Sequence, residues 1–136
     1  MSQETIDLGQ RLMDAINARE VSDDVAEELL APDYLIENTS TAVTDKSYYG
    51  AQGARDWISD FFEAFDEGAR FEVERVLADG DDYVVSMVRL IGHGARSGAP
   101  LVLRWVSVSW VQDGKVSRTV GYLSRRNALE AVGLEG

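Results

Sequence analysis

The first third of the chain carries apolar residues at the spacing of amphipathic helices. One stripe predicts a helix over residues 5–18 and consists of Leu8, Leu12, Ala15 and Ile16. A second, shorter helix is expected to begin at Ser22, because a serine hydroxyl accepts hydrogen bonds from the free amides of a first turn. Pro32 is expected to close that helix. A short strand is predicted over residues 34–37, and a polar loop from Asn38 to about Tyr49.

The clearest pattern is a wide aromatic stripe that predicts a third helix. Its members lie three and four residues apart and are Ala54, Trp57, Ile58, Phe61, Phe62 and Phe65. Gly68 is expected to end this helix, since glycine adopts the backbone conformation that follows many helices. Such a broad apolar face must be covered by another part of the protein.

After residue 70 the apolar pattern changes to that of strands, and turn residues separate the strands. Predicted strands cover residues 70–78, 83–91, 101–111 and 115–123, and a last helix covers residues 125–131. Asp113-Gly114 is a strong signal for a tight hairpin. Helices that precede a run of antiparallel strands are typical of an α+β fold. Residues 1–136 are of the usual size for one domain, and a single domain is expected.

Composition and charge exclude several classes of partner and chemistry. The net charge of −11 repels nucleic acid and anionic membrane surfaces. The N-terminus lacks the pattern of a signal peptide and no apolar run is long enough to span a membrane, so a cytoplasmic location is expected. The chain has no cysteine and a single histidine, so we expect no disulfide and no metal site. No cofactor is expected either, because no helix is predicted after the glycine-rich loop at 92–98, as a dinucleotide fingerprint requires.

Several short segments occur in a familiar order along nearly the whole chain. They are LLAPDYLIEN at 29–38, Tyr49-Gly50 before the third helix, GHGARSG at 92–98, QDGKV at 112–116 and ALEAVGL at 128–134. With these segments the chain resembles the SnoaL-like family of the nuclear-transport-factor-2-like superfamily. One position departs from the pattern: Ser124 stands where relatives often carry Asp before the last helix, and it is expected to cap that helix.

The resemblance implies a cone-shaped α+β fold. In such a fold a strongly bent mixed or antiparallel sheet wraps around N-terminal helices and encloses a pocket, and the proteins form homodimers. Relatives include ketosteroid isomerases, polyketide cyclases, limonene-epoxide hydrolases and dehydratases. The fold therefore constrains the pocket better than it constrains the reaction.

Aromatic residues from both halves of the chain are candidates for the wall of this pocket. We expect Trp57 and Phe61 to lie near it, together with Trp105 from the long strand. Trp105 and Trp110 must lie on opposite faces of the sheet, because strand side chains alternate. A phenol donor can come from Tyr34, and Tyr49 and Tyr122 are further pocket candidates.

Glu37, Tyr34 and Arg104 form the predicted catalytic set. A carboxylate of Glu37 in an apolar pocket would have a raised pKa and could act as acid or base, whereas at the strand end it could simply face water. Arg104 could pair with Glu37 across the pocket or with an acid on the outer face. His93 is a further candidate base, in a loop that is expected to be exposed.

The expected function is therefore binding of a small hydrophobic molecule. One interpretation adds a cofactor-independent isomerase, cyclase, dehydratase or hydrolase activity; the other is a non-catalytic ligand-binding or accessory dimerisation module. Whether the protein is an enzyme stays open from the sequence. A homodimer through the convex sheet face is expected, because residues 101–111 and 115–123 are apolar on both faces of their strands.

Overall fold

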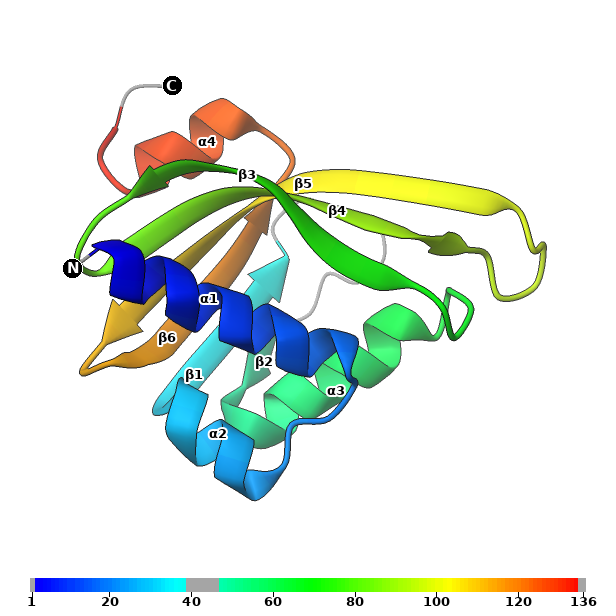
Figure 1. Cartoon of the computed structure of the whole chain (residues 1–136), viewed down its shortest axis with the longest axis horizontal. Coiled ribbons are helices and arrows are strands. Elements are labelled where there is room, and N and C mark those ends of the chain that lie inside the picture. Colours follow the sequence, from blue (N-terminus) through cyan, green and yellow to red (C-terminus); the bar gives the residue numbers. More distant parts are fainter. Residues whose placement is uncertain (1, 39–46, 135–136) are drawn as a thin grey trace.

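The structure is a computed structural model that describes residues 2–38 and 47–134 of the chain. In these residues the elements are α1 (Ser2–Asn17), α2 (Asp23–Leu29), β1 (Leu30–Asn38), β2 (Ser47–Tyr49), α3 (Gly50–Phe62), β3 (Arg70–Asp79), β4 (Tyr83–His93), β5 (Pro100–Gln112), β6 (Lys115–Tyr122) and α4 (Arg125–Ala131). Helices come first and the long strands later, which confirms the predicted α+β architecture (Figure 1).

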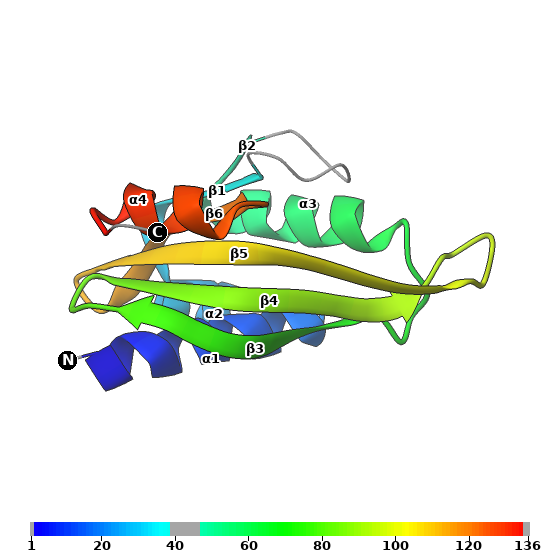
Figure 2. The ribbon, with the colours of Figure 1, turned by 90° about the horizontal axis from the view of Figure 1, so that it is seen from above.

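The described strands form one sheet with the order β2-β1-β6-β5-β4-β3. Strands β3 to β6 make an antiparallel meander, whereas β1 runs parallel to β6. The sheet is bent and is not closed. Helices α1 and α3 lie on its concave side, and α4 lies on the opposite side (Figures 1 and 2). The N-terminal helices thus fill the hollow of a bent sheet, as the predicted cone requires.

The main hydrophobic core lies between these helices and the concave face of the sheet. Leu12 of α1, Trp57 and Phe61 of α3, and Val88 and Leu90 of β4 are all buried within it. The aromatic stripe of α3 therefore faces the sheet, as predicted. Full burial of each such side chain stabilises the fold by roughly 1.5–3 kcal/mol.

A smaller apolar cluster lies on the outer face of the sheet, beneath α4. It joins Ala128 of α4 to Val85, Val106 and Val108 of β4 and β5, and Trp110 packs at its border. Part of the apolar outer face is therefore covered by the C-terminal helix. The homodimer through this face stays a prediction. The apolar outer residues that led to it could form an interface only where α4 does not cover them. Sedimentation can test it.

The end of α2 differs from the prediction. Ser22 does cap the helix, because its hydroxyl accepts a hydrogen bond from the Val25 amide at 3.2 Å. Pro32 does not close the helix but lies inside β1. That strand pairs with β6 at Leu30 and again from Leu35, with an irregular register between them. Proline, which has no amide hydrogen to donate, is tolerated in such an interruption.

The predicted stop of α3 at Gly68 is wrong, because the helix ends at Phe62. Beyond it, the Asp66 amide donates a hydrogen bond to the His93 carbonyl at 2.8 Å, which ties this segment to the end of β4. Phe65 still reaches the core and is 7% exposed. Backbone pairing with the sheet thus replaces the last predicted turn of the helix.

The connections from β1 to β2 and from β5 to β6 can also be compared with the sequence prediction. The predicted loop from Asn38 to Tyr49 contains the short strand β2, and its residues 39–46 lie outside the described part of the chain. The hairpin between β5 and β6 turns at Asp113 and Gly114, with φ values of 54° and 76°. Positive φ at both positions matches the tight turn that this residue pair predicts.

Candidate functional site

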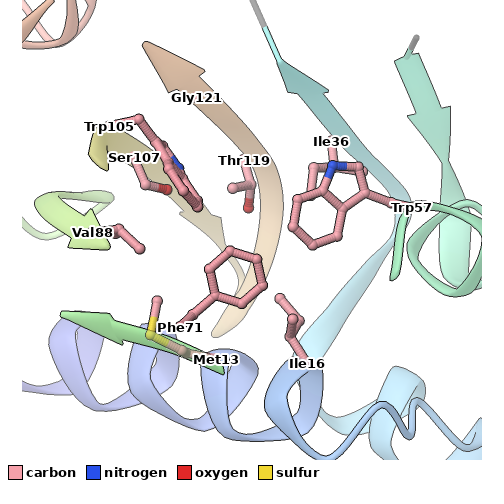
Figure 3. Close-up of a pocket in the computed structure, with 10 residues that line it drawn as sticks. All are labelled: Met13, Ile16, Ile36, Trp57, Phe71, Val88, Trp105, Ser107, Thr119 and Gly121. Carbon is pink, nitrogen blue, oxygen red and sulfur yellow. The ribbon is translucent and has the colours of Figure 1, made fainter. Parts of the chain in front are cut away.

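A cavity of about 50 Å³ lies between the concave face of the sheet and the helices. Helices α1 and α3 and five of the strands contribute to its wall (Figure 3): Met13, Ile16, Ile36, Trp57, Phe71, Val88, Trp105, Ser107, Thr119 and Gly121. None of these ten residues carries a charge. Mostly apolar walls with a few polar groups are typical of sites for small molecules.

Aromatic rings build much of this wall. Trp57 stacks on Phe61 and Phe71, with ring centroids 4.9 Å and 5.7 Å apart. Phe71 in turn meets the Trp105 ring edge to face at 5.4 Å. Both arrangements are favoured by aromatic pairs. They hold the rings in fixed positions around the cavity.

The indole nitrogen of Trp57 is buried and has no hydrogen-bond partner in the described part of the chain. Figure 3 shows it on the edge of the ring beside Ile36, whose side chain offers no acceptor. Buried tryptophan N–H groups usually find a partner, and an unpaired one costs about 1–3 kcal/mol. The packing around the cavity therefore leaves one buried hydrogen-bond donor unsatisfied.

The hydroxyls of Ser107 and Thr119 form the polar part of the wall, and the predicted residue Tyr34 lies behind it, not in it. Tyr34 of β1 is 1% exposed and donates a hydrogen bond to Thr119 Oγ1 at 3.0 Å. The same oxygen lies 3.4 Å from Ser109 Oγ. Burial raises the pKa of Tyr34 to about 12, against the smaller opposing effect of its hydrogen bond to Thr119. At neutral pH the phenol is thus an uncharged donor that orients the Thr119 hydroxyl.

A second cavity, of about 90 Å³, lies next to the first, between α1 and the sheet. Its wall contains hydroxyl groups from Ser86, Ser107 and Ser109. The two cavities share three lining residues: Met13, Val88 and Ser107. Met13 is the shared residue that comes from a helix, and its unbranched side chain can change rotamer at low cost.

The predicted catalytic residues Glu37 and Arg104 do not line the cavity. Glu37 pairs with Arg118 at 2.9 Å, and Arg104 pairs with Glu74 at 2.9 Å. Of the two partners expected for Arg104, the structure therefore shows the acid on the outer face. Each residue is the chain neighbour of one that lines the cavity, and successive side chains of a strand point to opposite faces. Their catalytic roles stay predictions.

The other predicted pocket residues divide between the cavity and the surface. Trp57 and Trp105 line the cavity, and Phe61 packs directly behind Trp57. Tyr49 is 70% exposed. Tyr122 packs in the cluster beneath α4, where partial burial raises its pKa. Ser107 and Thr119 were not among the predicted residues, although Ser107 lies two positions after Trp105 and thus on the same face.

Charged side chains gather on the outer face of the sheet. Glu72 of β3 binds Arg89 at 2.7 Å and Arg70 at 2.9 Å. Hydrogen bonds from Arg89 and then from Arg70 lower the pKa of the Glu72 carboxyl. Exposed pairs of this kind contribute little to stability. They place these charges on the side of the sheet away from the cavity.

The remaining candidate chemistry lies at the surface. His93 Nδ1 is 3.3 Å from an Asp66 carboxylate oxygen, and both side chains are exposed. Among residues 2–38 and 47–134, no group of three or more histidine and carboxylate side chains could hold a metal ion. No helix in these ranges is long and apolar enough to cross a membrane.

Comparison with known proteins identifies the family. The family model that describes SnoaL-like domain sequences matches residues 10–119 of this chain. This range includes every residue that lines the first cavity except Gly121. The chain belongs to the SnoaL-like domain family. The resemblance seen in the sequence is thereby confirmed. No curated protein matches this SnoaL-like domain in sequence.

Solved structures share the fold of this SnoaL-like domain. A protein with a ketosteroid isomerase-like fold from Catenulispora acidiphila, crystallised in complex with trimethylamine, is 13% identical, covers 96% of this chain and 95% of its own, and has a TM-score of 0.69. An NTF2-like protein from Mesorhizobium loti is 24% identical, with coverages of 90% and 93% and a TM-score of 0.66. A putative SnoaL-like polyketide cyclase from Jannaschia is 21% identical, with coverages of 89% and 85% and a TM-score of 0.65. These likenesses confirm the cone-like α+β fold.

Proposed function

We propose that this SnoaL-like domain binds a small hydrophobic molecule in the cavity between α1, α3 and the sheet. The observation that carries the proposal is the wall itself, in which Trp57, Phe71 and Trp105 surround a space next to the Ser107 and Thr119 hydroxyls. Aromatic walls supply most of the binding free energy in such sites, and a few polar groups orient the ligand.

The same wall favours binding over acid–base catalysis. A general acid or base needs a pKa near the working pH. The ten lining residues include no carboxylate, histidine or lysine, and Tyr34, with its pKa of about 12, keeps its proton at neutral pH. We therefore favour a non-catalytic binding module over a cofactor-independent isomerase, cyclase, dehydratase or hydrolase. This preference would be reversed if the wild-type protein turned over a substrate and the Glu37→Gln variant did not.

A small amine is the second candidate ligand. The Catenulispora acidiphila protein was crystallised with trimethylamine, which is a cation at neutral pH. Aromatic faces such as those of Trp57 and Trp105 attract cations. The described wall holds no carboxylate to balance the charge, however, and burying an unpaired cation is costly. These observations favour an uncharged ligand.

An NMR titration tests the proposed function. Methylenecyclobutane, a small neutral hydrocarbon, should shift the methyl signals of Met13, Ile36 and Val88 with a saturable concentration dependence. The Ser107→Leu variant, which fills the cavity, should weaken binding at least roughly tenfold, a loss of about 1.4 kcal/mol. In the matched control Gln112→Leu, the same side chain is placed at the exposed end of the same strand, and the affinity should stay at the wild-type value.

Two outcomes contradict the proposal. One is the absence of any saturable shift of the lining methyl groups up to the solubility limit of the hydrocarbon. The other is equal affinity in wild type and Ser107→Leu, which would place the bound hydrocarbon elsewhere. Titration with trimethylammonium chloride distinguishes the two ligand classes, because tighter binding of this cation would favour the amine.

A further inference from the structure

One half of β5 has a neighbouring strand on one side only. β4 pairs with β5 from Pro100 to Trp110, whereas the last residue of β6, Tyr122, lies opposite Val106. Figure 1 shows β5 running on past the end of β6. Residues 100–105 therefore form an open edge, called the β5 edge below, beside which no strand of the described residues pairs.

The direction of the backbone groups along this edge follows from the pairing with β4. The Val111 amide donates a hydrogen bond to the Asp82 carbonyl at 2.8 Å, so the odd-numbered residues of β5 bond to β4. The register of this pair is continuous, and antiparallel strands alternate the side to which their groups point. The N–H and C=O groups of Val102 and Arg104 therefore point away from β4, where β6 does not reach them.

Exposed apolar side chains surround these free backbone groups. Large exposed hydrophobic residues are few in the described part of the chain, and Leu101, Val102 and Leu123 are among them. Val102 is 49% exposed, and Leu123, which follows the point where β6 leaves β5, is 60% exposed. Apolar side chains beside an open strand edge are typical of a site that pairs with another chain.

The other edges of the sheet are protected against such pairing. The register of β3 shifts twice, and the strand carries the charged residues Glu72, Glu74 and Arg75. β2 is only three residues long. Bulges, charges and short length all prevent strand addition. Apart from Pro100 at its start, the β5 edge lacks these features, because the charge of Arg104 is drawn toward β3 by its ion pair with Glu74 at 2.9 Å.

A second copy of the chain is the partner whose charge fits this edge. The net charge of −11 makes two copies repel each other over most of their surface. Residues 100–105 contain no acid, and their one charged side chain is the positive Arg104. The β5 edge is thus a place where an acidic chain can approach its own copy without placing acids against acids.

The pairing register of two such edges can be chosen by elimination. If Val102 lay opposite its own copy, Arg104 would face the partner's Pro100, which has no amide hydrogen. If Arg104 lay opposite its own copy, like charges would meet, and Val102 would face the partner's Val106, which β6 already covers. With Leu103 opposite its own copy, Val102 and the partner's Arg104 exchange both backbone hydrogen bonds.

We propose that two copies of the chain pair antiparallel through their β5 edges, with Leu103 opposite the partner's Leu103. The partner's strand then continues the line of β6 and ends beside Leu123. This joins the two bent sheets edge to edge and differs from the dimer expected through the convex sheet face. It does not depend on a ligand in the cavity, so it can fail or succeed separately from the proposed function.

Single cysteines test the contact directly, because the chain has no cysteine of its own. Leu103→Cys should form a disulfide between two copies under mild oxidation. Opposite residues of a non-hydrogen-bonded pair have Cα atoms about 4.5 Å apart, which is within the range of a disulfide. Val102→Cys is the matched control. In this register it lies opposite Arg104 and not opposite its own copy, so it should cross-link at least roughly tenfold more slowly.

Two substitutions at Val102 separate edge pairing from a dimer through the convex face. Val102→Pro removes the outward amide, is tolerated at an edge position, and should weaken the dimer at least roughly tenfold. Val102→Thr keeps the amide and the branched side chain, so the dimer affinity should change at most about threefold. A convex-face dimer would instead respond equally to both, because it would use only the Val102 side chain. Sedimentation velocity over a concentration series measures both affinities.

Several results would overturn the proposal. A wild-type protein that sediments as a monomer up to its solubility limit would leave the β5 edge to a strand of a different protein. Faster cross-linking of Val102→Cys than of Leu103→Cys, or an equal effect of proline and threonine at position 102, would show that the dimer uses another contact. Should Val102→Pro not fold, the two cysteine variants decide alone.

Discussion

Tyr34 and Thr119 form a hydrogen bond of 3.0 Å between residues that are 85 positions apart in the sequence. The phenol belongs to β1 and the threonine to β6, which run parallel next to each other. Because Thr119 lines the cavity, this contact links the wall of the site to the pairing of the two strands. A change to either residue should therefore affect both the stability of the fold and the shape of the cavity wall.

Removing this hydrogen bond should destabilise the fold measurably. Tyr34→Phe and Thr119→Val are each expected to lower the free energy of unfolding by about 0.5–1.5 kcal/mol. The double variant should lose less free energy of unfolding than the two single variants together, because each single variant already removes the same hydrogen bond. Urea unfolding of the four proteins measures the coupling. If the two losses of unfolding free energy simply added in the double variant, the hydrogen bond would contribute nothing. Tyr49→Phe, at an exposed position, is the control for the loss of a phenol hydroxyl.

Stability should fall at alkaline pH through Tyr34. Its pKa is about 12 in the folded protein and about 10 when the chain is unfolded. Between these values the folded state keeps a proton that the unfolded state has released, so stability is lost as pH rises. Below pH 10 this contribution is fully present. One such group lowers the free energy of unfolding by ~1.4 kcal/mol per pH unit in this range.

Comparison with Tyr34→Phe isolates this effect from other titrating groups. The stability advantage of wild type over Tyr34→Phe should disappear and then reverse as pH is raised from about 10 to 12, because the loss of ~1.4 kcal/mol per pH unit exceeds it. Denaturation at a series of pH values gives the measurement. A constant difference across this range would show that burial does not raise the pKa of Tyr34.

Met13→Ala should join the two cavities. Met13 lines both, and its truncation should cost about 2–3 kcal/mol, near the lower end for a Met→Ala change in a core. Cavities of about 50 Å³ and 90 Å³ are each smaller than the apolar cavity of roughly 150 Å³ that is known to hold benzene. Benzene should therefore raise the melting temperature of the variant more than that of wild type. An equal effect on both proteins would mean that Met13 does not separate the cavities.

Two glycines in helices should respond to alanine in opposite ways. A Cβ atom at Gly53 of α3 would lie 2.7 Å from the carbonyl carbon of Tyr48, so Gly53→Ala should destabilise by about 1–3 kcal/mol. At Gly9 of α1 the nearest atom is Val84 Cγ1 at 3.5 Å, an ordinary contact. Gly9→Ala should stabilise by about 0.5–1 kcal/mol, because alanine favours the helix. Urea midpoints that move in the same direction for both variants would contradict this.

Helix and strand periodicity was enough to predict much of the fold and part of the cavity wall. The stripe on α3 identified Trp57, because its apolar neighbours recur at helical spacing. Alternation along β5 placed Trp105 and Trp110 on opposite faces, and the structure has Trp105 at the cavity and Trp110 in the outer cluster. Both inferences needed only local backbone geometry.

The same alternation explains why Glu37 and Arg104 do not line the cavity. Tyr34 and Glu37 are three positions apart on one strand, so a regular strand cannot turn both inward. Arg104 and Trp105 are adjacent, which excludes a shared face in the same way. Thr119 could not have been placed so simply, because the register of β5 and β6 shifts between Trp110 and Val111 and changes which residues face inward. The unpaired Trp57 nitrogen depends on packing between distant segments, which no local pattern encodes.

The parallel pairing of β1 with β6 also has a consequence for folding kinetics. β1 can pair with β2 early, but it remains without its parallel partner until β6, the last strand of the meander, is available. Contacts between such distant segments slow folding, because a long loop must close before they form. During synthesis on the ribosome, the meander of β3 to β5 can assemble first. Thr119 and Gly121 become available only with β6, so the cavity that they line is among the last parts of the domain to form.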